Sequence, residues 1–84
     1  MGYLVYIYIL HSHKSSRYYI GQTSNITVRL KKHNSGLVRS TKYGVPWELI
    51  TKIETITRSE ALILERKIKK RGAKRYLKDN QFGV

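Results

Sequence analysis

Cysteine is absent from this 84-residue sequence. Its absence excludes disulfide-stapled scaffolds, thiolate zinc sites and cysteine nucleophiles. Long hydrophobic runs are absent too. The apolar run from Tyr3 to Leu10 has eight residues, which is too short to span a bilayer. It also lacks the basic leader and the small-residue cleavage site of a signal peptide. We therefore expect a soluble, cytoplasmic protein with no membrane association.

Acidic residues are scarce. Five Asp and Glu stand against seventeen Lys and Arg, which gives a formal net charge of +12. So large a charge on so small a body repels itself, and it usually reflects a polyanionic partner. Nucleic acid is the favoured partner. The length allows one hydrophobic core, so residues 1–84 are expected to form a single domain.

Three runs of the sequence are typical of β-strands. β-Branched and aromatic residues dominate 3–10 and 17–23, which a polar loop joins into a hairpin, and 47–56 alternates well enough for a third strand. With the hairpin turn centred between residues 13 and 14, opposite residues have numbers that sum to 27. Tyr8 then faces Tyr19, although a slip of one position would break this pairing.

Helix signals follow the hairpin and the third strand. A cap at residue 24 or 25 starts a helix that runs to about residue 35, with Gly36 as its stop. A capping box at 57–60 precedes a helix over 61–70 that Gly72 ends. A closing helix over 73–81 would be docked by Tyr76, Leu77 and Phe82. The sequence thus predicts an α+β fold, a small three-stranded antiparallel sheet flanked by helices in the order β-β-α-β-α-α.

Glu65 is the acidic residue that its helix does not explain. Ala61, Leu64 and Ile68 cluster on a helical wheel, and Glu65 falls about 40° beyond Ala61, on the apolar side. Burying an unpaired carboxylate costs several kcal/mol, so this group needs a cation, a hydrogen-bond network or a metal. One interpretation is an i,i+4 ion pair with Lys69. The other is a Mg²⁺ site, because a lone carboxylate with waters in the remaining positions suits that ion in phosphoryl transfer.

Five positions stand in a characteristic order: Tyr8, Tyr19, Arg29, His33 and Glu65. Tyr19 begins the tripeptide Tyr-Ile-Gly, Arg29 follows it by ten residues, and His33 comes one helical turn later. In these residues the chain resembles the GIY-YIG endonuclease superfamily. It is most similar to small stand-alone bacterial members, which look like the catalytic domain of the excision-repair incision nuclease. The resemblance covers nearly the whole chain.

The chain departs from the family pattern at two places. The first tripeptide is Tyr6-Ile7-Tyr8, with tyrosine where the family name has glycine, and an alternative register would make Tyr6 the first catalytic tyrosine. The spacing of eleven residues to Tyr19 favours Tyr8. Gln22 stands where some members have lysine, so an activating cation would have to come from Lys14, Lys31 or Lys42.

The resemblance also implies the chemistry. Mg²⁺ (or Mn²⁺) would bind Glu65 and touch the scissile phosphate, while the Arg29 guanidinium would lie against the phosphate oxygens. One of Tyr8 and Tyr19 would orient or deprotonate the attacking water. Because free tyrosine has a pKa of about 10, a base role would require nearby cations that lower the pKa. His33 would bind phosphate or relay a proton.

Further positions complete the expected site. The family uses an asparagine on its terminal helix, for which Asn80 is the best candidate, although it could equally be a helix cap. His11 and His13 are two apart and form a less favoured alternative metal pair. The basic side chains expected to contact nucleic acid are Lys14, Lys31, Lys32, Arg39, Lys42, Lys69, Lys70 and Arg71.

The favoured function is therefore a Mg²⁺-dependent DNA endonuclease. Branched or damaged DNA is among its expected substrates. Because 84 residues leave no room for a separate specificity domain, a partner protein could supply targeting. The alternative is a nucleic-acid-binding module of the same fold that has little or no catalysis.

Overall fold

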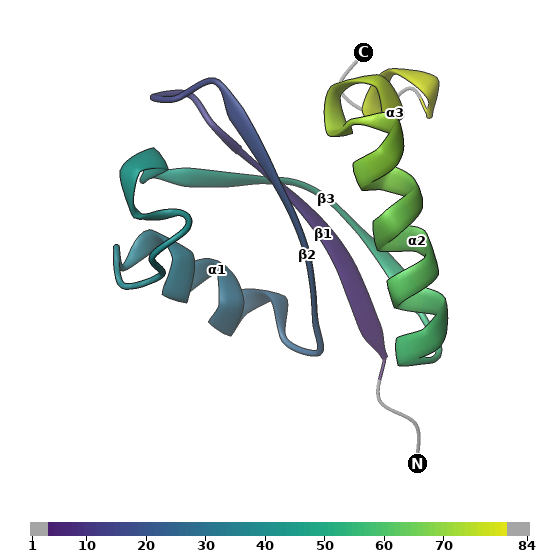
Figure 1. Ribbon diagram of the computed structural model, residues 1–84. Coiled ribbons are helices and arrows are strands. Elements are labelled where there is room, and N and C mark those ends of the chain that lie inside the picture. The colour runs from purple at the N-terminus through teal and green to yellow at the C-terminus, as the bar shows by residue number, and fades with distance from the viewer. Residues whose placement is uncertain (1–3, 81–84) are drawn as a thin grey trace.

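The computed structural model describes residues 4–80, and its elements follow the predicted order (Figure 1). They are β1 (Val5–Ser12), β2 (Arg17–Thr23), α1 (Ile26–Asn34), the 3-10 turn η1 (Lys42–Gly44), β3 (Trp47–Thr55), α2 (Arg58–Arg71) and α3 (Ala73–Asp79). Both the α+β class and the order β-β-α-β-α-α are confirmed. No helix within residues 4–80 is long and apolar enough to cross a membrane.

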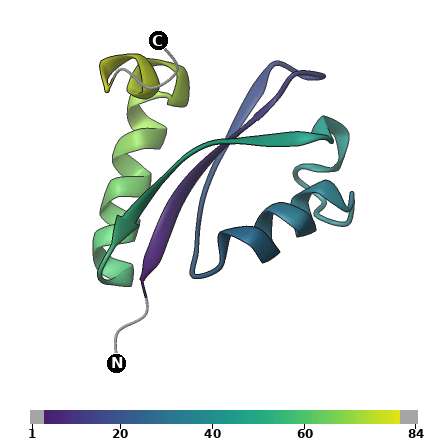
Figure 2. The ribbon, with the colours of Figure 1, turned by 180° about the vertical axis from the view of Figure 1, so that it is seen from behind.

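The sheet separates two helical layers. Its antiparallel strands lie in the order β2-β1-β3, so β1 is central and β2 and β3 form the two edges. Helix α1 packs on one face, and α2 with α3 packs on the other. Figure 1 shows β2 between α1 and α2, and Figure 2 shows β3 from behind. Groups from both layers can therefore approach each other around the β2 edge.

Each face of β1 builds its own core, as alternation of side chains requires. Towards α2 and α3 the buried residues are Val5, Ile7, Ile9, Ala61, Ile68, Ala73 and Leu77. Towards α1 they are Tyr8, Leu10 and Trp47, against which Ile26 and Leu30 pack. Tyr76 packs against the first core, which confirms the docking predicted for it and for Leu77. The docking predicted for Phe82 lies outside the described residues.

The hairpin register differs from the predicted one. Tyr8 lies opposite Gly21 and not opposite Tyr19, and Tyr19 lies opposite Leu10. Each residue of β1 therefore faces the β2 residue two positions later than predicted. The reason is the turn. It centres one residue later than predicted, because Ser12 pairs with Arg17 and its buried hydroxyl accepts a hydrogen bond from a backbone amide within the turn, at 3.1 Å. A shift of two positions keeps each side chain on its face. Tyr8 and Tyr19 therefore still share the α1 side.

The helix ends follow the predicted signals with small differences. Asn25 caps α1 by accepting from the Val28 amide at 3.0 Å, and Thr57 caps α2 by accepting from the Glu60 amide at 3.1 Å. Gly72 ends α2 with a positive φ of 93°, which favours glycine. Helix α3 ends at Asp79, one residue before its C-cap and two before the predicted end.

Asn34, at the end of α1, ties this helix to the start of β3. Its side-chain amide donates to the Trp47 carbonyl at 3.0 Å and accepts from the Trp47 amide at 2.6 Å. Two backbone groups at the outer edge of the sheet are thereby satisfied by one side chain. This clamp fixes α1 against the sheet, and with it the side chains that α1 carries.

Gly21 has no side chain because the Tyr8 ring occupies that space. A Cβ at this position would lie 2.5 Å from the Tyr8 hydroxyl oxygen and 2.7 Å from the ring carbon that bears it. Real Cβ atoms do not approach so closely, so a residue larger than glycine would displace the phenol. The glycine of the Tyr-Ile-Gly tripeptide thus sets the position of Tyr8.

We predict that Gly21→Ala lowers the free energy of unfolding by about 1–3 kcal/mol, because overpacking forces Tyr8 out of place. Urea denaturation measures this change. The matched control is the same substitution in a Tyr8→Leu background, where the hydroxyl and the ring are gone. There the cost should shrink, and an equal cost in both backgrounds would show that contact with Tyr8 is not the cause.

Candidate active site

The five residues of the predicted site come together around β2. Tyr8 of β1 and Tyr19 of β2 have ring centroids 6.1 Å apart. The His33 ring, from α1, lies 4.8 Å from the Tyr19 ring and 5.8 Å from the Tyr8 ring, again between centroids. Arg29 lies one helical turn before His33, and the charges of Arg29 and Glu65 both act on the Tyr8 phenol. The site therefore draws on both helical layers.

Tyr8 is almost fully buried, with 2 % of its surface exposed. Its hydroxyl lies 2.9 Å from His33 Nε2, within hydrogen-bond distance. Burial raises the pKa of the Tyr8 phenol well above its ordinary value, the nearby Tyr19 adds to this, and the charge of Arg29 only partly opposes it. The lowered pKa that a base role would require is therefore not found at Tyr8, because desolvation outweighs the cationic charge.

His33 is buried between two hydroxyl groups. Its Nδ1 lies 2.9 Å from Thr41 Oγ1, and the Thr41 carbonyl in turn accepts from the Trp47 indole at 2.8 Å. Burial lowers the pKa of the imidazole, as do the charges of Arg29 and Lys32, so His33 is neutral at pH 7. With 1 % of its surface exposed, this ring does not present itself to a phosphate in solution. Its contacts suit a proton relay better than a phosphate-binding role.

Glu65 reaches from α2 to the edge strand β2. Its Oε1 accepts from the Gln22 side-chain amide at 2.9 Å, and its Oε2 lies 2.7 Å from Lys69 Nζ. The i,i+4 pair considered from the sequence is thus present. Gln22 also accepts from the Arg58 guanidinium at 3.2 Å, which fixes the amide that holds Glu65. The carboxylate is consequently bound on both oxygens by partners from two elements.

The ionisation of Glu65 follows from these contacts. Burial alone would raise the pKa of this carboxyl, because only 14 % of its side chain is exposed and the charged form is poorly solvated. The hydrogen bonds from Lys69 and Gln22 and the charges of Lys69 and Arg66 outweigh burial and hold the pKa below its usual value. Glu65 is therefore an anion at neutral pH, the state that a metal ligand requires.

The donor set around Glu65 fits a weakly held divalent ion. Within residues 4–80, no three His, Cys, Asp or Glu side chains gather into a preformed metal cage. Mg²⁺ does not need one, because it often binds through one or two carboxylates and keeps its other positions for water and substrate phosphate. The half-buried Glu65 carboxylate already attracts the cationic Lys69, whose side chain is 55 % exposed and free to turn away. Glu65 could therefore hold such an ion in exchange for Lys69.

Two other predicted residues, Tyr6 and Asn80, lie further from this cluster or serve the fold. Tyr6 is on the same face as Tyr8, with Lys52 Nζ 5.3 Å from the centre of its ring. In the hairpin Tyr6 lies opposite Thr23, further along β2 from Tyr19 than the position that Tyr8 faces. This favours Tyr8 as the first tyrosine of the site. The Asn80 side chain donates to the Tyr76 carbonyl at 2.8 Å, so it acts as a cap at the end of α3.

The predicted nucleic-acid contacts are distributed over several elements. Lys14 lies in the hairpin turn, Lys31 and Lys32 on α1, and Arg39 and Lys42 in the connection to β3. Lys69 and Lys70 lie in the last turn of α2, together with Arg71, which makes a bidentate ion pair with Asp79 at 2.7 and 3.0 Å. Arg71 thus joins α2 to α3, and this ion pair makes its guanidinium less available to a phosphate.

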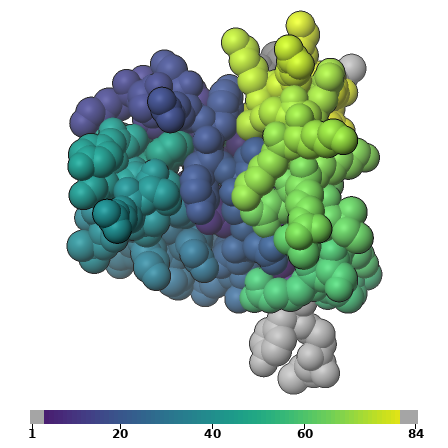
Figure 3. Space-filling view, viewed as in Figure 1, coloured from purple at the N-terminus to yellow at the C-terminus, as the bar shows by residue number. Residues whose placement is uncertain are grey.

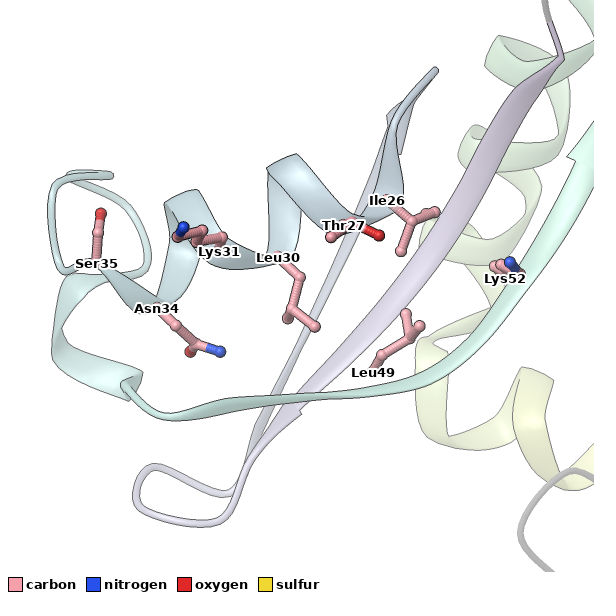
Figure 4. A pocket seen from close by; sticks show the side chains of 8 residues that line it. All are labelled: Ile26, Thr27, Leu30, Lys31, Asn34, Ser35, Leu49 and Lys52. Carbon is pink, nitrogen blue, oxygen red and sulfur yellow. The ribbon is translucent and has the colours of Figure 1, made fainter.

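A separate groove lies between α1 and β3. It has a volume of about 690 Å³ and an apolar floor that includes Ile26, Leu30 and Leu49. Figure 4 shows these side chains pointing into the space between the helix and the strand, with Lys31 and Lys52 nearby. The groove borders β3, at the opposite edge of the sheet from β2 and Glu65. It is therefore not part of the tyrosine cluster.

Two residues of the cluster carry no signal that identifies their role in the sequence. Gln22 follows the Tyr-Ile-Gly tripeptide directly, but only the fold shows that it holds Glu65. The alternation of β2 could have placed Gln22 on the α2 side, with Tyr18 and Ile20. Thr41 lies in an irregular connection, and its contact with His33 follows no local pattern.

Comparison with known proteins agrees with this geometry. The sequence matches the family model of the GIY-YIG catalytic domain over residues 4–78. It is also similar to the solution NMR structure of the UPF0213 protein BH0048 from Bacillus halodurans, with 29% sequence identity and a TM-score of 0.60. That match covers 95% of this chain and 87% of the other. Among curated proteins none matches. The chain therefore belongs to the GIY-YIG family of nuclease domains.

Proposed function

We propose that this protein is a metal-dependent endonuclease that hydrolyses phosphodiester bonds in DNA. The observation that carries the proposal is the hydrogen bond from Gln22 to Glu65, which brings a carboxylate of α2 to the strand that carries Tyr19. Hydrolysis of a phosphodiester needs an aligned water, neutralised phosphate charge and help for the leaving oxygen. The cluster around β2 offers a group for each of the first two needs and a carboxylate for a metal.

Arg29 and Glu65 would manage the charge of the substrate. Within residues 4–80 no carboxylate pairs with Arg29, so its planar guanidinium can donate twice to the scissile phosphate. Glu65 would hold Mg²⁺ or Mn²⁺, which polarises the phosphate and stabilises the leaving oxygen. Lys69, displaced from Glu65, would remain close enough to contact the DNA backbone.

Tyr8, Tyr19 and His33 would handle the proton of the attacking water. With the proton of neutral His33 on Nδ1, where Thr41 Oγ1 accepts it, Nε2 is free to accept from Tyr8. Although only 2 % of the Tyr8 surface is exposed, a water that enters with the substrate would give its proton to the Tyr8 oxygen while the Tyr8 proton passes to His33. The raised pKa of Tyr8 favours this coupled transfer over a preformed phenolate. Tyr19, which is less buried, would orient the water or a phosphate oxygen.

A second candidate is a nucleic-acid-binding module with little or no catalysis. It is favoured by one observation: both oxygens of Glu65 already have partners, Gln22 and Lys69. If those contacts persist with DNA bound, no metal enters. The high positive charge would then serve binding alone. Action on branched or damaged DNA, targeting by a partner protein, a role in DNA repair and a cytoplasmic location belong to the endonuclease proposal and not to this second candidate.

We predict that Glu65→Gln abolishes Mg²⁺-dependent nicking of supercoiled plasmid, with a loss of about 100-fold or more, because metal polarisation supplies several kcal/mol. Glutamine keeps the shape of the side chain, and its carbonyl oxygen can still accept from Gln22, so the fold should survive. Glu60→Gln is the matched control, since it removes an exposed carboxylate from the same helix. It should nick at the wild-type rate.

Cleavage by Glu65→Gln at the wild-type rate would remove the proposed metal site. Salt-sensitive DNA binding with no cleavage by the wild-type protein would favour the binding module instead. Thermal unfolding of each variant shows whether a lost activity reflects a lost fold.

We also predict that the nicking rate falls with acid pH as His33 becomes protonated, because the imidazolium cannot accept the Tyr8 proton. The pKa of His33 lies below its ordinary value of 6.5, so the rate should hold down to that pH and fall below it. Glu65 stays ionised in this range, since its pKa is held below 4.5. The measurement is the rate from about pH 7.5 to about pH 5.

Two histidine variants identify the group whose protonation causes this fall in rate at acid pH, the acid limb of the pH profile. His33→Gln should be slow and lack the limb, while His13→Gln, in the exposed hairpin turn, should keep both rate and limb. A limb that persists in His33→Gln would assign the titration to another group.

A further inference from the structure

A second cleft opens beside Tyr19, between the hairpin turn and the η1 connection. It has a volume of about 430 Å³, and its walls include Arg17, Tyr18, Tyr19, Tyr43 and Trp47. Figure 3 shows the hairpin end (purple) directly above the η1 region (teal), with β2 beside them. Because Tyr19 belongs both to this cleft and to the catalytic cluster, a ligand in the cleft would lie next to the site of hydrolysis.

Tyr43 is the unusual wall of this cleft. It is the middle residue of η1, and 76% of its surface is exposed, so its ring contributes little to either core. Lys42 Nζ lies 5.0 Å from the centre of the ring. An exposed aromatic ring beside cationic groups is the arrangement with which proteins bind single-stranded nucleic acid, by stacking bases and attracting phosphates.

The cleft also has the right charge for such a ligand. Arg17 lies in its wall, and Lys14 and Lys42 come from the two segments that border it. No acidic residue lines it among the described residues. Its volume falls within the range of pockets that hold small organic groups, and a nucleobase is a flat group of that kind.

We propose that this cleft receives an unpaired nucleotide of the DNA substrate, with its base stacked on Tyr43. A base within a duplex is covered on both faces by its neighbours, so only an unpaired or extruded base can offer a face to the ring. The substrate class is therefore DNA with an unpaired nucleotide next to the cleaved bond, such as a flap, a gap or a bubble. This inference rests on the proposed endonuclease function for the role of the cleft in cleavage.

Binding without metal tests the cleft independently of cleavage. In the presence of a chelator, fluorescence anisotropy compares the affinity of the protein for a labelled oligothymidine and for a blunt duplex. Tyr43→Ala should weaken binding of the single strand by about tenfold, because one stacking contact is lost, and change duplex binding by less than about twofold. Tyr43→Phe, which keeps the ring, should bind both as the wild type does.

Leu37→Ala is the control for disturbing the same connection, since Leu37 is 84% exposed and does not line the cleft. It should leave both affinities unchanged. The proposal is overturned if Tyr43→Ala has no effect, or if it weakens single strand and duplex equally. It is also overturned if Tyr43→Phe fails as badly as Tyr43→Ala.

The two proposals fail in different ways. Plasmid nicking together with single-strand binding that does not depend on Tyr43 would keep the endonuclease and reject the cleft. Single-strand binding that depends on Tyr43, in a protein that does not nick DNA, would keep the cleft and reject hydrolysis.

Discussion

The hydrogen bond between Gln22 and Glu65 fixes the α2 carboxylate at the edge strand β2, and the proposed chemistry depends on it. Tyr8, Tyr19, Arg29 and His33 all lie on the α1 side, whereas Glu65 belongs to α2, on the opposite face. Only an edge strand allows groups from both faces to meet. Strand β2 is such an edge, and Gln22 holds the carboxylate there at 2.9 Å.

The site contains several buried polar groups in a small fold. Each of these groups has a hydrogen-bond or ion-pair partner that offsets the cost of its desolvation. The Tyr8 hydroxyl pairs with His33, His33 pairs with Thr41, and Glu65 pairs with Lys69. Satisfied networks of this kind rigidify a site, while an unsatisfied member would cost about 1–3 kcal/mol. Gly21 adds a steric constraint, because its missing side chain leaves room for the Tyr8 phenol. Preorganisation and stability therefore come from the same contacts.

The sequence was sufficient for local features and insufficient for those that depend on distant contacts. Helix capping and strand alternation depend only on residues close together in the sequence. The structure accordingly shows the caps at Asn25 and Thr57, the stop at Gly72 and the two faces of β1. The register was wrong by two positions, since it depends on a turn that a buried serine fixes. The raised pKa of Tyr8 could not be predicted either, because burial is a property of the whole fold. The roles of Gln22 and Thr41 depend on residues far along the chain, so no local pattern could reveal them.

Paramagnetic broadening by Mn²⁺ in NMR spectra of the free protein tests the central claim most directly, because it locates the metal without requiring cleavage. The account predicts that low concentrations of Mn²⁺ selectively broaden signals from residues around Glu65, including the Gln22 side-chain amide, and that Glu65→Gln removes this effect. Broadening centred on the hairpin histidines His11 and His13, unchanged by Glu65→Gln, would contradict it.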